Sequence, residues 1–212
     1  MANQTQRPDT ALHNTSHLMQ YHDLIESIVA AMDARDAYTA KHSDRVADMV
    51  LVLATALDLS EDETTLLHMA AHLHDIGKIA VPDSVLRKAG PLTNPEWEEM
   101  RRHPVTGYEI LRKVDDFKEI AVLVRHHHER WDGRGYPDGL SGDQIPISAQ
   151  VVAMADVYDA LVSKRVYKDA YAPDVAVQMI LHGDCGAFNP LLLDCLTDLQ
   201  DIFKAELAAP EA

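Results

Sequence analysis

The sequence predicts an all-α fold, for three reasons. Apolar residues recur at spacings of three and four along most of the chain, which is the period of one helix face. No region alternates polar and apolar residues over a useful length, as a half-buried strand would. Ser60–Glu63 has the pattern of a capping box, and Thr93–Glu96 starts another helix with Pro95 in its first turn.

The length and composition predict one domain with a full core. The 212 residues are 47% hydrophobic and 25% charged, which is ordinary for a soluble globular protein. We expect the domain over residues 21–207, with a polar tail at 1–20 and a short tail at 208–212.

The N-terminal half predicts three helices that lead to a His-Asp pair. Their apolar stripes cover residues 24–32, 46–57 and 66–73. The polar segment 36–43 separates the first two stripes and places His42 near the inward face of the second helix. The third helix ends at His74-Asp75, two side chains that suit a divalent metal better than an apolar core.

The rest of the chain predicts further helices around one long loop. An extended link is expected over 79–83, and helices over 93–103, 105–113, 117–128, 148–162, 173–180 and 190–207. Residues 130–147 contain four glycines and two prolines, which is typical of a loop. Trp131 and Tyr136 within it favour an ordered, functional loop.

Charge and cysteine content exclude several classes of partner. The formal net charge of −15 argues against DNA or RNA, whose binding depends on neutralising phosphates, but not against a small anionic substrate. Only Cys185 and Cys195 are present, which is consistent with a reducing cytoplasm. The first nine residues lack an apolar signal region, and no apolar run approaches the ~18–20 residues that span a bilayer. We expect a cytoplasmic protein with no membrane partner.

Seven side chains on predicted helices, or at their ends, are candidate metal ligands. They are His42, His74, Asp75, His103, His127, His128 and Asp156. Neutral imidazoles with carboxylates suit iron, manganese or zinc, and seven groups exceed what one ion takes. Two divalent ions sharing Asp75 account for the number, and such pairs catalyse in-line displacement at phosphorus. Lys78 would add positive charge at the phosphoryl oxygens.

The other histidines are expected to have no part in this site. His13, His17 and His22 fall in or near the polar N-terminal stretch and should be solvated. His68 and His72 are one turn apart but share no face with Asp75, so we expect them to be structural or exposed. Of the three consecutive histidines at 126–128, at most two can face one site.

The ligand pattern resembles that of a known family. His42, His74-Asp75 and Asp156 match the H…HD…D signature of the HD-domain metal phosphohydrolases. A longer set of motifs is similar to the HD-GYP subfamily: His74-Asp75-Ile76-Gly77-Lys78, Pro82-Asp83, Gly90-Pro91-Leu92-Thr93, His127-His128-Glu129, Gly135-Tyr136-Pro137 and Asp156-Val157-Tyr158-Asp159-Ala160-Leu161. The likeness covers roughly Ile25 to Leu196.

The resemblance implies an HD-domain helical bundle with a GYP loop, acting as a bacterial cyclic di-GMP phosphodiesterase. It implies a centre of iron or manganese, in which a hydroxide bridging the metals opens the cyclic dinucleotide to pGpG and the reaction can continue to GMP. The seven candidate ligands would hold the metals, with Asp75 and Lys78 as catalytic residues. Lys78, Tyr136, Arg165 and Lys168 would contact the substrate.

Departures from the family pattern refine the expectation. Tyr38 stands where some members carry a glutamate that helps to bind a third metal, so we predict two ions. Family members are usually fused to a sensor or receiver module, which this sequence leaves no residues to form. Regulation then comes from elsewhere, for which a protein partner in trans is one possibility, or the sequence is that of the catalytic domain alone. The helix from Leu24 leaves a homodimer open.

Two other functions remain open at this point. One is hydrolysis of a different nucleotide, such as a mixed cyclic dinucleotide, because base identity cannot be read from these residues. The other is a non-catalytic dinucleotide receptor or protein-interaction module that keeps its HD core for structure. The intact ligands and Lys78 favour an enzyme.

Overall fold

The computed structural model describes residues 20–35, 41–164 and 169–207, with side chains described up to residue 200, and every regular element in these ranges is a helix. The predicted all-α fold is confirmed. The α-helices are α1 (His22–Asp33), α2 (His42–Ala56), α3 (Glu61–Leu73), α4 (Asp83–Leu86), α5 (Asn94–Met100), α6 (His103–Leu111), α7 (Lys118–His126), α8 (Ile147–Val162), α9 (Pro173–Leu181) and α10 (Pro190–Leu207). Short 3₁₀ helices are η2 (Ile76–Ala80), η3 (Asp115–Phe117) and η4 (Gly142–Gln144).

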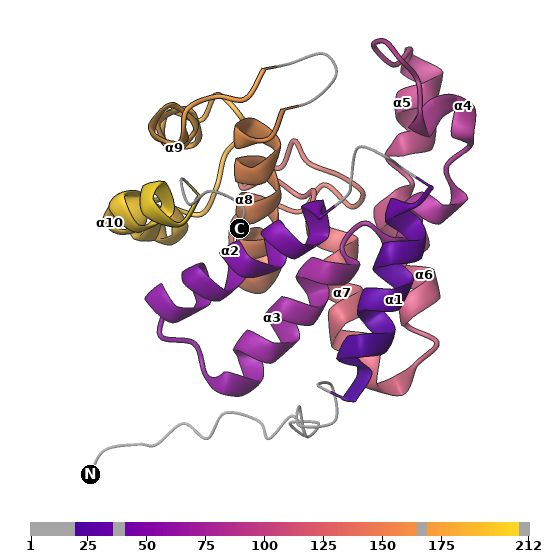
Figure 1. Cartoon of the computed structure of the whole chain (residues 1–212), viewed down its shortest axis with the longest axis horizontal. Helices are drawn as coiled ribbons and strands as arrows, with labels where there is room; N and C mark the ends of the chain where they lie inside the picture. Colours follow the sequence, from indigo (N-terminus) through magenta and orange to yellow (C-terminus); the bar gives the residue numbers. More distant parts are fainter. Residues whose placement is uncertain (1–19, 36–40, 165–168, 208–212) are drawn as a thin grey trace.

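The core lies between α2, α3, α7 and α8. In Figure 1 these helices occupy the middle of the molecule, with α9 and α10 at one end and α4 to α6 at the other. The spacing of apolar residues explains the packing, since Val46, Val50 and Leu53 of α2 lie on one stripe and are fully buried. α1 packs across α3 and also contacts η2.

Both predicted helix starts have the expected caps. The Ser60 side chain accepts a hydrogen bond from the Glu63 backbone N–H, and the Glu63 carboxylate accepts one from the Ser60 backbone N–H at 3.0 Å. Thr93 and Glu96 form the same reciprocal pair at the start of α5. Each box satisfies backbone donors that the first helical turn leaves free.

The segment after the His-Asp pair differs from the predicted extended link over 79–83. Residues 76–80 form the 3₁₀ helix η2 and α4 begins at Asp83, so only Val81 and Pro82 are extended. The backbone N–H of Lys78 donates to the Asp75 carbonyl at 2.8 Å, which continues the chain in tight turns after α3 ends. A run of five residues is too short for its hydrophobic pattern to distinguish a tight helix from an extended link.

α6 packs directly on the backbone of η2. A Cβ atom built on Gly77 would overlap the carbonyl oxygen of His103 and lie 2.6 Å from the backbone nitrogen of Gly107. Only glycine permits this approach. The contact positions His103, the first residue of α6, beside Asp75. The predicted helix began at Val105, two residues later, so this contact was not expected.

Among the described residues, no helix combines the length and the apolar character that crossing a bilayer requires.

Candidate metal centre

All seven predicted ligands converge on one site, and all but Asp156 lie at helix ends. His42 begins α2, His74 and Asp75 follow α3, His103 begins α6, His127 and His128 follow α7, and Asp156 lies within α8. The buried members are His42, His74, Asp75, His103 and His127, each at most 7% exposed. Because helix ends supply most of the ligands, the seven side chains meet although they are spread over more than 100 residues of sequence.

The ligands form two groups, and Asp75 stands between them. One group is His42, His74 and Asp75, and the other is His103, His127 and His128. Asp75 Oδ2 lies 3.3 Å from His74 Nε2, while Asp75 Oδ1 lies 3.3 Å from His103 Nε2. Asp156 Oδ1 lies 3.2 Å from His42 Nε2 and so joins the first group. One carboxylate thus presents an oxygen to each group, as a ligand bridging two ions would.

Three of the imidazoles are oriented by the helix turns that precede them. The Nδ1 atoms of His74, His103 and His127 donate to the carbonyl oxygen three residues earlier, at 2.6, 2.8 and 2.7 Å. A carbonyl can only accept, so Nδ1 carries the proton and the Nε2 lone pair faces the centre. His74 Nε2 is buried and has no hydrogen-bond partner. A buried lone pair of this kind fits a metal ion.

His42 is oriented by a carboxylate. Its Nδ1 donates to Asp159 Oδ2 at 2.6 Å, and Asp159 also accepts from Arg45 Nε at 2.5 Å. The Asp159 residue is 1% exposed. Its role was not assigned from the sequence, although its position one helical turn after Asp156 is a usable signal. Outer carboxylates of this kind fix the tautomer and direction of a metal-binding imidazole.

The charge states of the site suit divalent cations. Burial lowers the pKa of His103 to about 4 and that of His128 to about 3, and it holds the pKa of His127 well below its usual value. These three imidazoles are therefore neutral, the form that binds metal. Burial alone would raise the pKa of Asp75, but Lys78 and His74 lower it well below its usual range. Burial lowers the pKa of His42, but hydrogen bonds to Asp156 and Asp159 raise it to about 9, so this imidazole would give up a proton when an ion binds. Neutral imidazoles with ionised carboxylates are a donor set for first-row divalent ions.

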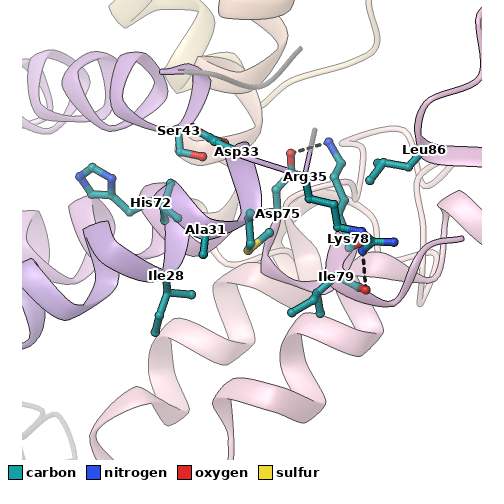
Figure 2. Close-up of a pocket in the computed structure, with 12 residues that line it drawn as sticks. Ile28, Ala31, Asp33, Arg35, Ser43, His72, Asp75, Lys78, Ile79 and Leu86 are labelled. Atoms are coloured by element: carbon teal, nitrogen blue, oxygen red, sulfur yellow. Dashed lines mark hydrogen bonds and ion pairs between the residues drawn. The ribbon is translucent and has the colours of Figure 1, made fainter. Parts of the chain in front are cut away.

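Lys78 lies at the edge of this centre. Its Nζ is 2.5 Å from Asp75 Oδ2, and both side chains line a cavity of about 210 Å³ between α1 and η2 (Figure 2). The other walls are mostly apolar and include Ile28, Met32 and Ile79. The ammonium group therefore stands next to the carboxylate that joins the two ligand groups.

Arg35, directly after α1, holds the backbone around Lys78. Its guanidinium donates to the carbonyl oxygens of Lys78 at 3.2 Å, Ile79 at 2.5 Å and Val81 at 2.5 Å. It also pairs with Asp83 at 2.8 Å. Arg35 was not predicted from the sequence, because no local pattern shows that α1 lies over η2. Arg35 ties α1 to the segment that carries Lys78.

The GYP loop lies against the second ligand group. The Tyr136 ring is 4.8 Å from the His128 ring, and the Arg101 guanidinium lies 5.4 Å from the Tyr136 ring centroid. Burial and the nearby carboxylates raise the pKa of Tyr136, so its hydroxyl keeps its proton. Arg101 is a cation near the site that the sequence analysis did not identify.

Glu129 fastens the far side of the GYP loop. Its buried carboxylate accepts from the backbone N–H groups of Asp138 at 2.6 Å, Gly139 at 3.1 Å and Leu140 at 3.0 Å. Three N–H donors on one carboxylate make a strong local anchor. The preceding His126 points elsewhere, since its Nε2 lies 3.0 Å from Asp138 Oδ2. Only two of the three consecutive histidines face the metal centre, as predicted.

We expect Glu129→Ala to release the loop without emptying the metal centre. The variant leaves three backbone donors without their acceptor, at a cost of about 1–3 kcal/mol for each group that stays buried. Metal content should stay close to that of the wild type, while KM for the substrate rises. Metal analysis and steady-state kinetics check this, with exposed Glu119→Ala as the control. A loss of metal equal to the loss of activity would contradict a role in the loop.

Five residues with sequence predictions fall outside the described part of the chain. They are Arg165 and Lys168, predicted to contact the substrate, Tyr38, which led to the count of two ions, and His13 and His17, predicted to be solvated. Their roles stay predictions.

His22 corrects one expectation. Its side chain is 24% exposed, and its ring stacks on that of His68 with centroids 5.6 Å apart. The prediction of a solvated side chain is wrong, because α1 begins at His22 and packs this residue onto α3. His72 is buried, and its ring is directed away from Asp75 (Figure 2).

Comparisons with known proteins agree with this geometry. A family model described as HD domain matches residues 23–185. The chain is 43% identical over 176 residues to the cyclic di-GMP phosphodiesterase response regulator RpfG of Xanthomonas campestris pv. campestris, covering 82% of this chain and 47% of RpfG. It is 40% identical over 188 residues to the 3'3'-cGAMP-specific phosphodiesterase 2 of Vibrio cholerae, covering 86% of this chain and 35% of that protein.

A solved structure shares the fold. Bd1817, an HDGYP protein of Bdellovibrio bacteriovorus, superposes with a TM-score of 0.63 at 21% identity, over 91% of this chain and 69% of that chain. The chain spans less than half the length of the two curated relatives named above. With the family match over most of its length, and with the HD ligands together in one site, the chain belongs to the HD-domain family.

Proposed function

We propose that this chain is a metal-dependent phosphodiesterase that hydrolyses cyclic di-GMP to pGpG and can continue to GMP. The observation that carries the proposal is the position of Asp75, whose two oxygens face two separate groups of histidines. This arrangement suits a pair of ions and a phosphodiester. The printed names of the relatives, cyclic di-GMP and cGAMP phosphodiesterases, support the substrate class.

We further propose two ions, iron or manganese. His42, His74 and Asp156 would hold one ion, the second histidine group would hold the other, and Asp75 would bind both. When bound, such ions lower the pKa of a water molecule and neutralise charge on the phosphoryl group. The hydrogen bonds that the Nδ1 atoms donate would hold the ligand directions fixed.

Other side chains act on the substrate itself. Lys78, beside Asp75, would donate a hydrogen bond to a phosphoryl oxygen as negative charge develops there. Tyr136 offers an aromatic face in a loop held by Glu129, which suits stacking on a guanine base. Arg101 over the Tyr136 ring would add a cation for a phosphate of the dinucleotide.

A second substrate has a specific observation in its favour. One curated relative is named as specific for 3'3'-cGAMP, at 40% identity over 188 residues. Both substrates present the same phosphodiester to the metal centre and differ in one base. Cyclic di-GMP remains our first choice, because another relative, 43% identical, carries that substrate in its name. A regulatory partner in trans, a homodimer and a cytoplasmic location stay predictions.

A competition assay tests the proposal. The wild-type chain, loaded with Mn²⁺ or anaerobically with Fe²⁺, receives equal concentrations of cyclic di-GMP and 3'3'-cGAMP, and the linear products are separated by chromatography. We expect pGpG to form faster than the linear product of cGAMP. The reverse order would shift the assignment to the mixed dinucleotide. No hydrolysis of either substrate with either metal would contradict the enzymatic function and favour a non-catalytic receptor.

A further inference from the structure

A second group of histidines lies between α1 and α3, outside the metal centre. His22 is the first residue of α1, and His68 and His72 stand one turn apart on α3. One ligand nitrogen from each of these rings lies within 4.8 Å of the others. Figure 2 shows the His72 ring directed away from Asp75. We call His22, His68 and His72 the histidine cluster.

The distance between two of its nitrogens matches a shared ion. His68 Nε2 and His72 Nε2 are 3.3 Å apart. Two nitrogens bound to one tetrahedral Zn²⁺, each at about 2.0–2.1 Å, lie about 3.3–3.4 Å from each other. An N–H···N hydrogen bond is the other arrangement at this distance, and only one of the two rings could then donate. A shared cation would instead occupy the lone pairs of both rings.

Two rings of the histidine cluster have a carboxylate near Nδ1. His72 Nδ1 is buried without a hydrogen-bond partner, and the Oδ1 atom of Asp44 lies 3.6 Å from it. His22 Nδ1 lies 3.5 Å from Glu26 Oε1, one turn further along α1. Metal-bound histidines commonly give their second ring N–H to a carboxylate, which needs only a small closing movement here. The acidic groups also favour a cation over a neutral ligand.

One ring of α3 is in the form that binds metal. Burial lowers the pKa of His68. This imidazole is neutral at neutral pH and need not lose a proton to bind an ion. His72 is 5% exposed, whereas the His22 side chain is 24% exposed. The His22 side of the cluster is open enough for solvent to supply a fourth ligand.

We propose that the histidine cluster binds one zinc-type divalent cation, which ties α1 to α3. Three imidazoles select Zn²⁺, Ni²⁺ or Cu²⁺ over Mg²⁺ and Ca²⁺, because nitrogen donors suit the later first-row ions. The role is structural. α1 leads directly to Arg35, which holds the backbone of Lys78, and α3 ends at His74. Fixing α1 on α3 therefore steadies the wall of the cavity beside the metal centre. The proposal does not depend on the substrate of that centre.

Zinc counting on matched variants tests the site. Wild-type chain, His68→Gln, His22→Gln and the control His182→Gln, an exposed histidine far along the sequence, are equilibrated with buffered Zn²⁺ and analysed by mass spectrometry for zinc per chain. We expect both cluster variants to hold one zinc fewer than the wild type and the control. Their affinity for that zinc should fall about 100-fold or more, since loss of an outer partner alone costs 10–100-fold. Zinc should also raise the melting temperature of the wild type more than that of either cluster variant.

Equal zinc counts in all four proteins, each with a native circular dichroism spectrum, would overturn the proposal. Should a variant fail to fold, the wild type still decides the question. Crystals grown with Zn²⁺ should show an anomalous peak at the zinc edge between His22, His68 and His72, and no peak there at saturating zinc would refute the site. The same variants distinguish an ion in the histidine cluster from the ions of the metal centre. His68→Gln should lose the cluster ion and keep the two ions proposed for the metal centre.

Discussion

Replacing Gly77 with alanine should abolish most of the activity by displacing one ligand. The new Cβ would meet the carbonyl oxygen of His103 and the backbone nitrogen of Gly107, so α6 must move away from η2. Backbone atoms cannot rotate aside as a side chain can, and overpacking of this kind costs about 1–3 kcal/mol of stability. His103 moves with α6, and a shift of about 1 Å at a reacting centre can lower turnover about 100-fold. We expect reduced metal content and a turnover loss of that order.

Gly90→Ala is the matched control for this change. A Cβ built on Gly90 meets nothing within 4 Å, and the residue lies outside the metal centre. Thermal unfolding, metal analysis and turnover of the two variants should therefore diverge. Wild-type metal content and turnover in Gly77→Ala would show that α6 does not depend on this contact.

Asp159→Asn should lower metal affinity although Asp159 touches no proposed ion. The carboxylate holds His42 Nδ1 and the Arg45 guanidinium together in a buried position. An amide keeps the shape, but it removes the charge that faces Arg45 and weakens the bond that fixes the His42 ring. Loss of an outer partner costs about 10–100-fold in metal affinity. Removing one partner of a fully buried charged pair costs about 3–5 kcal/mol of stability. The cost is smaller here, because the Arg45 side chain is about a third exposed and water can solvate its charge.

Metal titrations of Asp159→Asn and of the control Asp143→Asn, carried out separately, measure this effect. Asp143 is exposed in η4, away from the ligands. We expect a lower apparent affinity only in Asp159→Asn, with a smaller change in turnover at saturating metal. Wild-type affinity in Asp159→Asn would contradict the orienting role.

The ligands could be predicted from the sequence because their types and motifs are local. His74-Asp75 at the end of an apolar stripe, and Asp156 on a later one, are recognisable without coordinates. The residues that orient them are different. Asp159 acts on His42 from 117 positions away, and Glu129 acts through backbone donors of a loop. Such partners become visible only when helix packing is known.

The geometry around α1 was the least predictable part. The hydrophobic stripe of α1 shows that it packs, but not on which neighbour, so neither the Arg35 contacts nor the place of His22 against α3 could be expected. The sequence shows Gly77 only as part of a motif. A glycine is needed there because the backbone of α6, which begins 26 residues later, packs against it. Long-range packing is the information that a single sequence does not carry locally.

Turnover of cyclic di-GMP by the metal-stripped wild type, before and after Mn²⁺ or Fe²⁺ is restored, tests the central claim most directly. We expect no hydrolysis after chelation, recovery of pGpG formation when either ion returns, and none at any metal concentration in Asp75→Ala. Hydrolysis that survives chelation, or that persists in Asp75→Ala at the wild-type rate, would contradict a metal centre joined by Asp75.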